Sequence, residues 1–443
     1  MNNILKKDVI WGYLAQFLNI GSGLILIPVA LRYLDSEDMG LWYLFLTMLG
    51  LAQLLEFGFQ PTISRMTSYV YAGANELYAE GIPPKDKNID YQLLYDLQQA
   101  SKKLYKIVAL LVLILLFFIG TVYLNTFESF GNDQKLAWFL FLFSNVINFY
   151  FTYFNGLLIG RGDQKELYRI MTISKLIMLF VSSLLLFLNY GLVSMSVGVC
   201  FSIFYSRYML NKVYYLKHQK MKFNFNLKKD YIKVLWLASY KLGITGLGAF
   251  LIQRSSFFIV SSYFGLSTTA KYGVTFQVIS VLSSLSSVLF YLNLPRFNTL
   301  QSNGDKKTLK KEVPKQIKLS LLLYTIGGAI IIFFGFDLLS FISNGMTLLD
   351  TNIIILMLII AMLEMNHSLW AQYLTTLNII PFAKVSIVVG IITVIASLIL
   401  VNYSEYGLIG LVICQGLIQL SFSNWYWPLI AYKDLNQKTT CIK

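Results

Sequence analysis

Charged side chains inside apolar stretches are the residues of this sequence best suited to chemistry. Lys241 and Arg254 both lie in the stretch 234–264, which exceeds the ~20 residues that a helix needs to cross a bilayer. A cation at bilayer depth costs about 2.5–3.5 kcal/mol to insert, so Arg254 is expected to face protein or water. Arg254 is therefore a candidate anion site; the alternative is a structural partnership with Glu56 or Glu364. Lys241 either joins the anion site or extends to the membrane edge.

A second candidate is the pair Glu364 and His367, three residues apart near the middle of a predicted span. Residues at this spacing share a helix face, and histidine titrates near neutral pH, so the pair is suited to coupling transport to protons. A satisfied structural pair is the alternative. Glu56 lies deep in another predicted span and is a further coupling candidate.

Amide and hydroxyl side chains form stripes along several apolar stretches. Such stripes either join helices by hydrogen bonds or line a hydrated cavity that binds a polar substrate. Their spread over both halves of the chain favours a shared cavity, and we take Gln16, Asn19, Gln53, Asn145 and Asn148 as candidate substrate-binding residues. Further stripes contain Thr152 and Asn155, Ser280, Ser283, Ser284 and Ser287, and Gln415 and Gln419.

Sequence motifs of the common enzyme classes are absent. The chain has no G-x-x-x-x-G-K-[ST] loop for ATP, no H-E-x-x-H or Cys/His metal spacing, and no G-x-S-x-G nucleophile turn. We therefore predict a transporter rather than an enzyme, with no catalytic residues, no metal and no cofactor.

Spanning helices must position these side chains. Of the 443 residues, 56% are hydrophobic and 13% are charged, about half the charged share of a soluble domain. The pattern predicts an all-α, polytopic membrane protein with twelve transmembrane helices. The predicted spans are 9–31, 41–62, 104–124, 136–158, 168–188, 191–210, 234–264, 271–293, 317–336, 352–377, 381–401 and 407–430.

The distribution of lysine and arginine predicts the orientation of these spans. Alternate loops are basic, above all the loop 207–233 with Arg207, and the intervening loops are acidic or weakly charged. By the positive-inside rule both termini are cytoplasmic. The net charge of +14 is thus explained by topology and requires no nucleic-acid partner.

The chain also divides into two similar halves. We predict an N-terminal six-helix lobe over 1–215, a basic cytoplasmic linker over 216–233, and a C-terminal six-helix lobe with a short tail over 234–443. In the loop before the third span, 91–106 has leucines at helical spacing, which predicts an amphipathic helix on the cytoplasmic surface, as a lid or membrane anchor or as a guide for a lipid substrate or partner.

Short motifs in both halves resemble one transporter family. The segments Met39-Gly40-Leu41-Trp42, Glu56-Phe57-Gly58-Phe59 and Leu294-Pro295-Arg296 are similar to those of polysaccharide-export flippases. The resemblance is greatest to O-antigen repeat-unit flippases of the Wzx type. Their superfamily also holds the multidrug/toxin extruders and the lipid II flippases.

This resemblance implies two six-helix lobes around a central cavity in the bacterial inner membrane. It implies alternating-access translocation of an undecaprenyl-diphosphate-linked oligosaccharide to the outer leaflet for lipopolysaccharide biosynthesis. The implied partners are membrane lipids, a polysaccharide polymerase and a chain-length regulator. The family's cavity cations follow no fixed motif, so no position matches Arg254.

Physical chemistry agrees with such a substrate. Amide-rich helix faces can replace water around sugar hydroxyls, and a guanidinium can hold a diphosphate. Moving about two negative charges outward across 100 mV is favourable by roughly 4–5 kcal/mol. Three alternatives remain: an ion-coupled multidrug extruder with buried carboxylates, an O-antigen polymerase, for which a large outer loop is expected, and a membrane scaffold.

Overall fold

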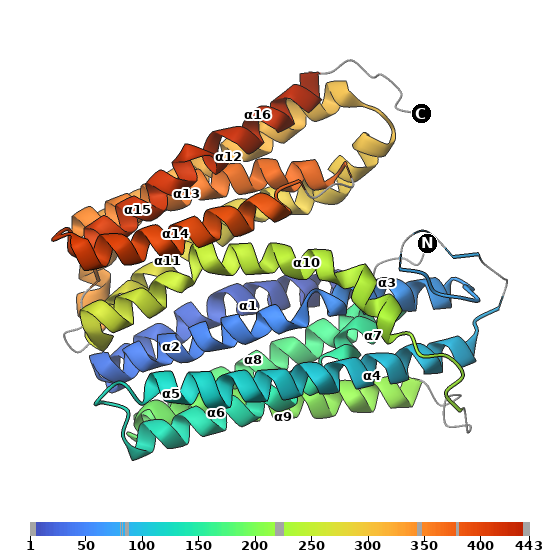
Figure 1. Cartoon of the computed structure of the whole chain (residues 1–443), viewed down its shortest axis with the longest axis horizontal. Helices are drawn as coiled ribbons and strands as arrows, with labels where there is room; N and C mark the ends of the chain where they lie inside the picture. Colours follow the sequence, from blue (N-terminus) through green and yellow to red (C-terminus); the bar gives the residue numbers. More distant parts are fainter. Residues whose placement is uncertain are drawn as a thin grey trace. The chain divides into compact units, whose positions relative to one another are not determined.

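The computed structural model describes residues 6–79, 81, 83–84, 88–217, 226–342, 348–377 and 381–436. For 6–10, 12–17, 19–20, 217, 241–242, 336 and 338–342 it describes the backbone only. These residues form helices, and the described part of the chain contains no β-strand element (Figure 1). The prediction of an all-α fold is confirmed.

The chain divides into two compact units, Met1–Gly246 and Leu247–Lys443, which we call the N-terminal unit and the C-terminal unit. The division falls inside one helix, so the lobe boundaries expected from the sequence remain a prediction. Part of the expected linker, 218–225, lies outside the described residues.

The N-terminal unit consists of long helices that run side by side (Figure 1). Helix α8 packs against α9 and α1, α9 also packs against α6, and α3 packs against α7. The helices are α1 Lys6–Tyr33, α2 Ser36–Gln53, α3 Phe59–Tyr71, α4 Tyr91–Ile114, α5 Thr121–Leu124, α6 Asn132–Tyr150, α7 Tyr153–Arg161, α8 Gln164–Phe187, α9 Gly191–Lys217 and the start of α10 Ile232–Gln253, with a 3₁₀ turn, η1 Leu54–Glu56, and a π-helical turn, η2 Leu115–Gly120.

The C-terminal unit begins within α10. Helix α11 packs against α12 and α13, α13 packs against α16, and α14 packs against α15. Gly265 has φ 78°, and this left-handed residue divides α11 into two helical parts. The helices are α11 Ser255–Ser302, α12 Lys306–Ile342, α13 Thr351–Thr375, α14 Ala383–Tyr403, α15 Gly407–Ser421 and α16 Ser423–Asn436.

Glycines allow helices of the N-terminal unit to pack backbone to backbone. A Cβ atom on Gly160 of α7 would overlap the backbone oxygen of Ser64 in α3, and one on Gly156 would lie 2.9 Å from that of Gln60. Two small residues four positions apart form the usual motif for close helix contact in membranes, where hydrophobic burial gives no driving force between helices. This packing fixes α7 against α3.

Ten helical segments in the described residues are long and apolar enough to cross a membrane. Together with the fold, they make this chain a multi-pass membrane protein. One segment, Gly243–Ser302, contains the division at Gly265, and only the part of α1 from Gly21 to Tyr33 was counted, as a shorter apolar helix. The number of twelve crossings therefore stays a prediction.

Two of the predicted spans are interrupted rather than continuous. The predicted span 41–62 is broken after η1, where Phe57 and Gly58 have φ values of 47° and 72°. The predicted span 234–264 is broken at Arg254, between α10 and α11. Helix periodicity cannot reveal these breaks, because both lie within apolar sequence.

The predicted surface helix over 91–106 is wrong as a separate element. These residues form the first part of α4, which continues without interruption to Ile114. Leu94, Leu97 and Leu104 are at most 5% exposed, so their face is buried in protein rather than lying on a membrane surface.

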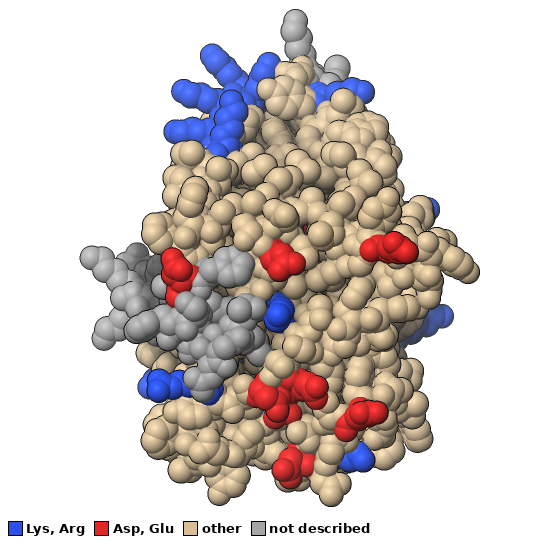
Figure 2. All heavy atoms as spheres, turned by 90° about the vertical axis from the view of Figure 1, so that its left-hand side faces the viewer, with Lys and Arg blue, Asp and Glu red and all other residues tan. Residues whose placement is uncertain are grey.

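Connections between helices of the N-terminal unit alternate between its two ends. In Figure 1 the turns at 33–36, 125–131 and 188–190 lie at the left-hand end, and the turn at 161–164 lies at the right. Figure 2 looks onto the left-hand end, where several acidic side chains are set in a surface that is mostly neither acidic nor basic. Asp38 in the first turn of α2 accepts a hydrogen bond from Gln134 at 2.9 Å, which ties α2 to α6.

Candidate functional site

A buried arginine in the N-terminal unit donates hydrogen bonds to several side chains of neighbouring helices. Arg207 lies in α9 and is 9% exposed. Its Nε and Nη2 atoms donate to Oδ1 of Asn148 at 2.8 and 2.6 Å. Nη1 donates to Oδ1 of Asn155 at 2.9 Å, and Nη2 donates to Oγ1 of Thr152 at 3.1 Å. The polar stripe on α6 and α7 thus serves as an acceptor surface for this guanidinium.

Glu56 lies near the same group at the break between α2 and α3. The hydroxyl of Tyr105, which is fully buried, donates to Glu56 Oε1 at 2.7 Å, and Arg207 attracts the carboxylate electrostatically. The Tyr105 hydroxyl and the Arg207 guanidinium therefore both favour the charged form of this half-buried carboxylate, against the cost of removing it from water.

The Glu-Phe-Gly-Phe motif is the structural cause of this position. Phe57 and Gly58 take left-handed conformations in succession, which glycine adopts freely and phenylalanine adopts at a cost of roughly 1–2 kcal/mol. The ring of Phe57 packs against Trp236 of α10 with centroids 5.3 Å apart. This aromatic contact holds the strained turn and leaves Glu56 as the last residue of η1.

The other candidates of the N-terminal unit have different surroundings. Asn145 is 2% exposed and donates to the backbone oxygen of Phe141 at 2.8 Å, so its amide is used within its own helix. Gln53 is exposed near the end of α2. Gln16 and Asn19 lie on α1, where their side chains are outside the described part of the structure.

Arg254 occupies the break between α10 and α11 in the C-terminal unit. Its backbone is in the right-handed region with φ −114°, and its N–H still donates to the oxygen of Phe250 at 2.8 Å. The guanidinium carbon lies 5.3 Å from the ring centroid of Phe276, within the range of a cation–π contact. The side chain is half-buried.

Hydroxyl groups lie next to this arginine. Ser255 and Ser256 follow it at the start of α11 and are both buried. The hydroxyl of Tyr272 donates to Oγ of Ser256 at 2.9 Å. The Tyr272 ring also stacks on that of Phe276, with centroids 6.3 Å apart. A cation, hydroxyls and aromatic faces therefore lie together, which are groups that bind phosphates and sugars.

Glu364 is brought close to this cluster. Gln253, the last residue of α10, donates from Nε2 to Glu364 Oε1 at 2.6 Å. Tyr272 lies in the electrostatic field of both Glu364 and Arg254. The structure thus gathers the predicted anion site and one predicted coupling residue in one place.

His367 and Glu364 interact with each other electrostatically, and each also has a partner of its own. His367 Nδ1 lies 2.7 Å from Oδ1 of Asn424, which belongs to α16. The two predicted coupling residues therefore connect α13 to different helices, Glu364 to α10 and His367 to α16.

The structure gives no binding role to two further candidates, Lys241 and the serine stripe of α11. The side chain of Lys241 on α10 lies outside the described residues. The serines of α11 bond to their own helix, because Ser283, Ser284 and Ser287 each donate to the carbonyl oxygen four residues earlier.

Arg207 is the residue that the sequence analysis missed. Its assignment to the basic loop 207–233 is wrong, because α9 continues through it to Lys217 and the side chain is buried. Counting cations by the positive-inside rule placed it outside the membrane. The signal was the spacing of Asn148, Thr152 and Asn155, which makes an acceptor stripe that needs a donor.

No group of three or more His, Cys, Asp or Glu side chains that could hold a metal ion occurs in the part of the chain that the structure describes.

Comparisons with known proteins identify the fold. No protein-family model matches the sequence, and neither does any curated protein. Among solved structures, an inward-facing multidrug resistance MATE family transporter of the MOP superfamily matches with a TM-score of 0.68 and 13% identity, covering 98% of this chain and 100% of that one. The lipid II flippase MurJ in an inward closed conformation matches with a TM-score of 0.68 and 14% identity, covering 96% and 87%. The MATE multidrug transporter DinF-BH matches with a TM-score of 0.64 and 12% identity, covering 98% and 96%. This chain has the fold of MOP superfamily transporters.

Proposed function

We propose that this protein is a flippase that moves an undecaprenyl-diphosphate-linked oligosaccharide from the cytoplasmic to the outer leaflet of the bacterial inner membrane. The observation that carries the proposal is Arg254, a guanidinium at a helix break beside hydroxyls and aromatic rings. The likeness of the fold to that of a lipid II flippase supports a lipid-linked substrate. O-antigen or a related surface polysaccharide is the substrate class.

The topology of the proposed flippase has twelve crossings with both termini in the cytoplasm. The ten candidate segments support this number if α1 crosses once and Gly243–Ser302 crosses twice, on the two sides of Gly265. A cysteine introduced at Ser36 should then react with an impermeant thiol reagent in intact cells, and one at Asn303 should not. Labelling at Asn303 from outside contradicts the topology.

Arg254 binds the diphosphate in this proposal. A guanidinium offers parallel donors that match two phosphate oxygens, whereas a lysine ammonium is a single point charge. The half-buried ring of Phe276 provides a further contact for sugar rings, and the buried hydroxyls of Tyr272 and Ser256 bond to each other beside it. The outward movement of the negative headgroup is driven by the membrane potential, at about 2.3 kcal/mol per charge for 100 mV.

The central experiment measures transport in a strain that lacks the gene and carries plasmid variants. The strain should accumulate lipid-linked repeat units on the cytoplasmic side and lose surface polysaccharide. Arg254→Ala should restore almost no surface polysaccharide. Arg254→Lys should restore part of it, because lysine keeps the positive charge but lacks the parallel donors of the guanidinium. Normal display with Arg254→Ala contradicts the proposal.

A double variant separates anion binding from a structural role. Glu364 lies in the same electrostatic environment as Arg254, so Arg254→Ala could fail by leaving the carboxylate uncompensated. Membrane abundance of each variant is measured in parallel. If adding Glu364→Gln restores transport to Arg254→Ala, the arginine is a counter-ion and the anion site is wrong.

An ion-coupled multidrug extruder is the second candidate. The observation in its favour is that Glu364 is half-buried beside the same cluster, where a carboxylate can bind a cationic drug. The fold likeness to multidrug transporters supports it equally. Raised resistance to cationic dyes on expression, lost with Glu364→Gln and kept with Arg254→Ala, would favour this function over the flippase.

A further inference from the structure

A groove of 840 Å³ opens on the N-terminal unit. It lies between α4 and α6, and the connection that leads into α10 contributes Leu227 and Asp230 to its rim. Its size is within the usual range of ligand sites.

One end of the groove is basic. Lys102, Lys103 and Lys106 lie on the exposed side of α4 and line it. Lys103 forms an ion pair with Asp230 at 3.1 Å. The other two lysines form no ion pair among the described residues, so a positive charge of about two remains for a ligand.

The rest of the groove is apolar. Leu110 and Leu113 follow the lysines along α4, and Val146 and Ile147 of α6 form the opposite wall. Leu110 is 55% exposed, as expected for a side chain that faces lipid. Tyr150 lies on the same wall, and tyrosine is enriched where the membrane meets water. The basic end and the apolar wall are therefore arranged as the headgroup and the chains of a lipid are.

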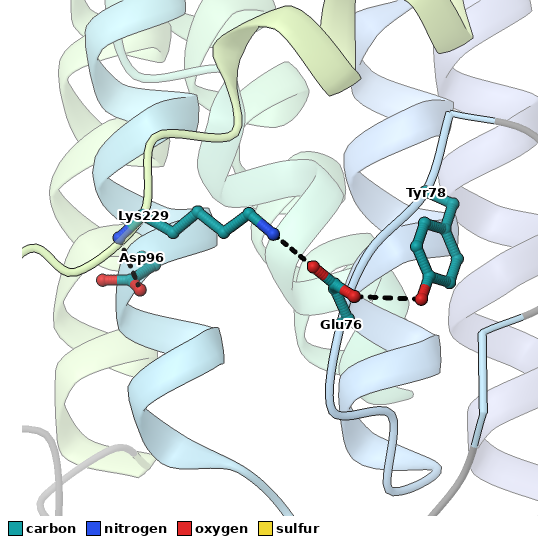
Figure 3. Close-up of polar contacts among 4 residues, drawn as sticks. All are labelled: Glu76, Tyr78, Asp96 and Lys229. Carbon is teal, nitrogen blue, oxygen red and sulfur yellow. Dashed lines mark hydrogen bonds and ion pairs between the residues drawn. The ribbon is translucent and has the colours of Figure 1, made fainter.

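A fixed connection completes the basic end. Asp96 of α4 is 3% exposed and accepts hydrogen bonds from the backbone N–H groups of Lys228 at 3.1 Å and Lys229 at 3.2 Å. The Lys229 side chain reaches across to Glu76, which also accepts from Tyr78 (Figure 3). These bonds hold the connection against α4, so Leu227 and Asp230 have defined places at the rim.

We propose that this groove binds an anionic glycerophospholipid of the surrounding bilayer, with its phosphate on Lys102 and Lys106 and an acyl chain against Leu110, Leu113 and Val146. The charge and the apolar wall complement the two parts of such a lipid. A polybasic cluster at a membrane surface attracts anionic lipid with an energy that corresponds to about fivefold in affinity per lysine. The inference concerns binding alone and is independent of the proposed transport.

The test uses the purified full-length protein and measures phosphatidylglycerol and phosphatidylcholine binding by native mass spectrometry. Phosphatidylglycerol should bind at least tenfold more tightly than phosphatidylcholine. The double variant Lys102→Gln, Lys106→Gln should lose most of this preference. The matched control Lys310→Gln, Lys311→Gln removes the same charge from exposed positions of α12 and should keep it. Equal loss in both double variants overturns the site.

A second variant tests the apolar wall. Val146→Trp places a larger side chain in the groove and leaves the lysines intact, and it should weaken phosphatidylglycerol binding severalfold. Unchanged binding in this variant, or full competition by inorganic phosphate, would mean that the lysines bind an anion without its chains, and the lipid assignment is then wrong. Tighter binding of undecaprenyl phosphate than of phosphatidylglycerol would likewise overturn it and assign the groove to the substrate lipid.

Discussion

Arg207 and Arg254 both lie within candidate membrane spans, and their surroundings differ in kind. The guanidinium of Arg207 is surrounded by oxygen acceptors from α6, α7 and the turn between them, each within 3.4 Å. Arg254 lies at a helix end, half-buried, with its guanidinium over the ring of Phe276.

The difference shows that depth in the membrane does not by itself make an arginine a binding residue. An arginine whose donors are satisfied by fixed amides stabilises the fold, because a ligand would have to replace bonds that already exist. Arg254 differs in being half-buried at the end of α10 rather than enclosed in protein. We therefore assign a structural role to Arg207, and the anion site at Arg254 remains a proposal.

The largest effect expected from this comparison is that of removing Arg207. Arg207→Ala leaves the amides of Asn148 and Asn155 without a donor and Glu56 without its cation. Breaking a buried charged network costs about 3–5 kcal/mol, so little folded protein should remain in the membrane. Fluorescence-detected size-exclusion chromatography of tagged variants measures this amount.

Arg254→Ala is the matched variant in that measurement. It should keep a near-normal amount of folded protein while losing transport. If Arg207→Ala folds normally and only transport fails, the roles of the two arginines are exchanged and the comparison is wrong.

The second prediction concerns the helix contact that carries Asn155. Gly160→Ala would place a Cβ atom in overlap with a backbone oxygen of α3, so α3 and α7 must separate. Overpacking of this kind typically costs about 1–3 kcal/mol. Thermal unfolding in detergent should show a clear loss of stability.

Two other glycines provide the comparison. At Gly390 in the C-terminal unit a Cβ atom would lie 2.7 Å from that of Leu251, which is attached to the α10 backbone three residues before Arg254. At Gly21 it would meet nothing within 4 Å, so Gly21→Ala should be neutral or slightly stabilising. If Gly160→Ala is also neutral, the rigidity that we assign to the Arg207 region is not supported.

The sequence did not predict the helix break at Arg254 or the hydrogen bonds of Arg207. Composition and apolar periodicity predicted the all-α membrane fold, because both depend only on local sequence. The motif at Glu56 was recognised, but its left-handed turn depends on the packing of Phe57 against Trp236, a contact between distant parts of the chain. Burial of Arg207 depends in the same way on three residues of α6 and α7.

The candidate site was predicted in part for the same reason. Arg254 and Glu364 were each selected as charges within apolar sequence, and the structure places both near Tyr272. Asn148 was selected as a substrate ligand, but its oxygen accepts two bonds from Arg207. A sequence shows that a polar group needs a partner; only the fold shows which partner it has.

The third prediction tests the environment of Arg254 through its neighbours. His367→Gln removes a titratable group that is bonded to Asn424 and attracted by Glu364. If Glu364 and His367 couple transport to protons, the pH dependence of transport should change and substrate binding should be largely kept. A pH profile identical to that of the unmodified protein, with binding lost, would move His367 from coupling to substrate recognition.

The smallest effect is expected at Glu76, whose ion pair with Lys229 is exposed and therefore contrasts with the buried network of Arg207. The hydrogen bond from Lys229 lowers the pKa of Glu76 below its ordinary value of 4.5. A lowered pKa in the folded state means that the pair stabilises the protein above pH 4.5, and that this contribution is lost as the pH falls through the lowered pKa. Glu76→Gln should therefore lower the thermal midpoint slightly at neutral pH. The difference should vanish once the pH lies below the lowered pKa, where the carboxyl group of the unmodified protein is protonated and neutral like the amide. If the two thermal midpoints still differ in acid, Glu76 acts through packing rather than charge. If they differ greatly at neutral pH, an exposed ion pair matters as much as a buried one, and the assignment of Arg207 loses its support.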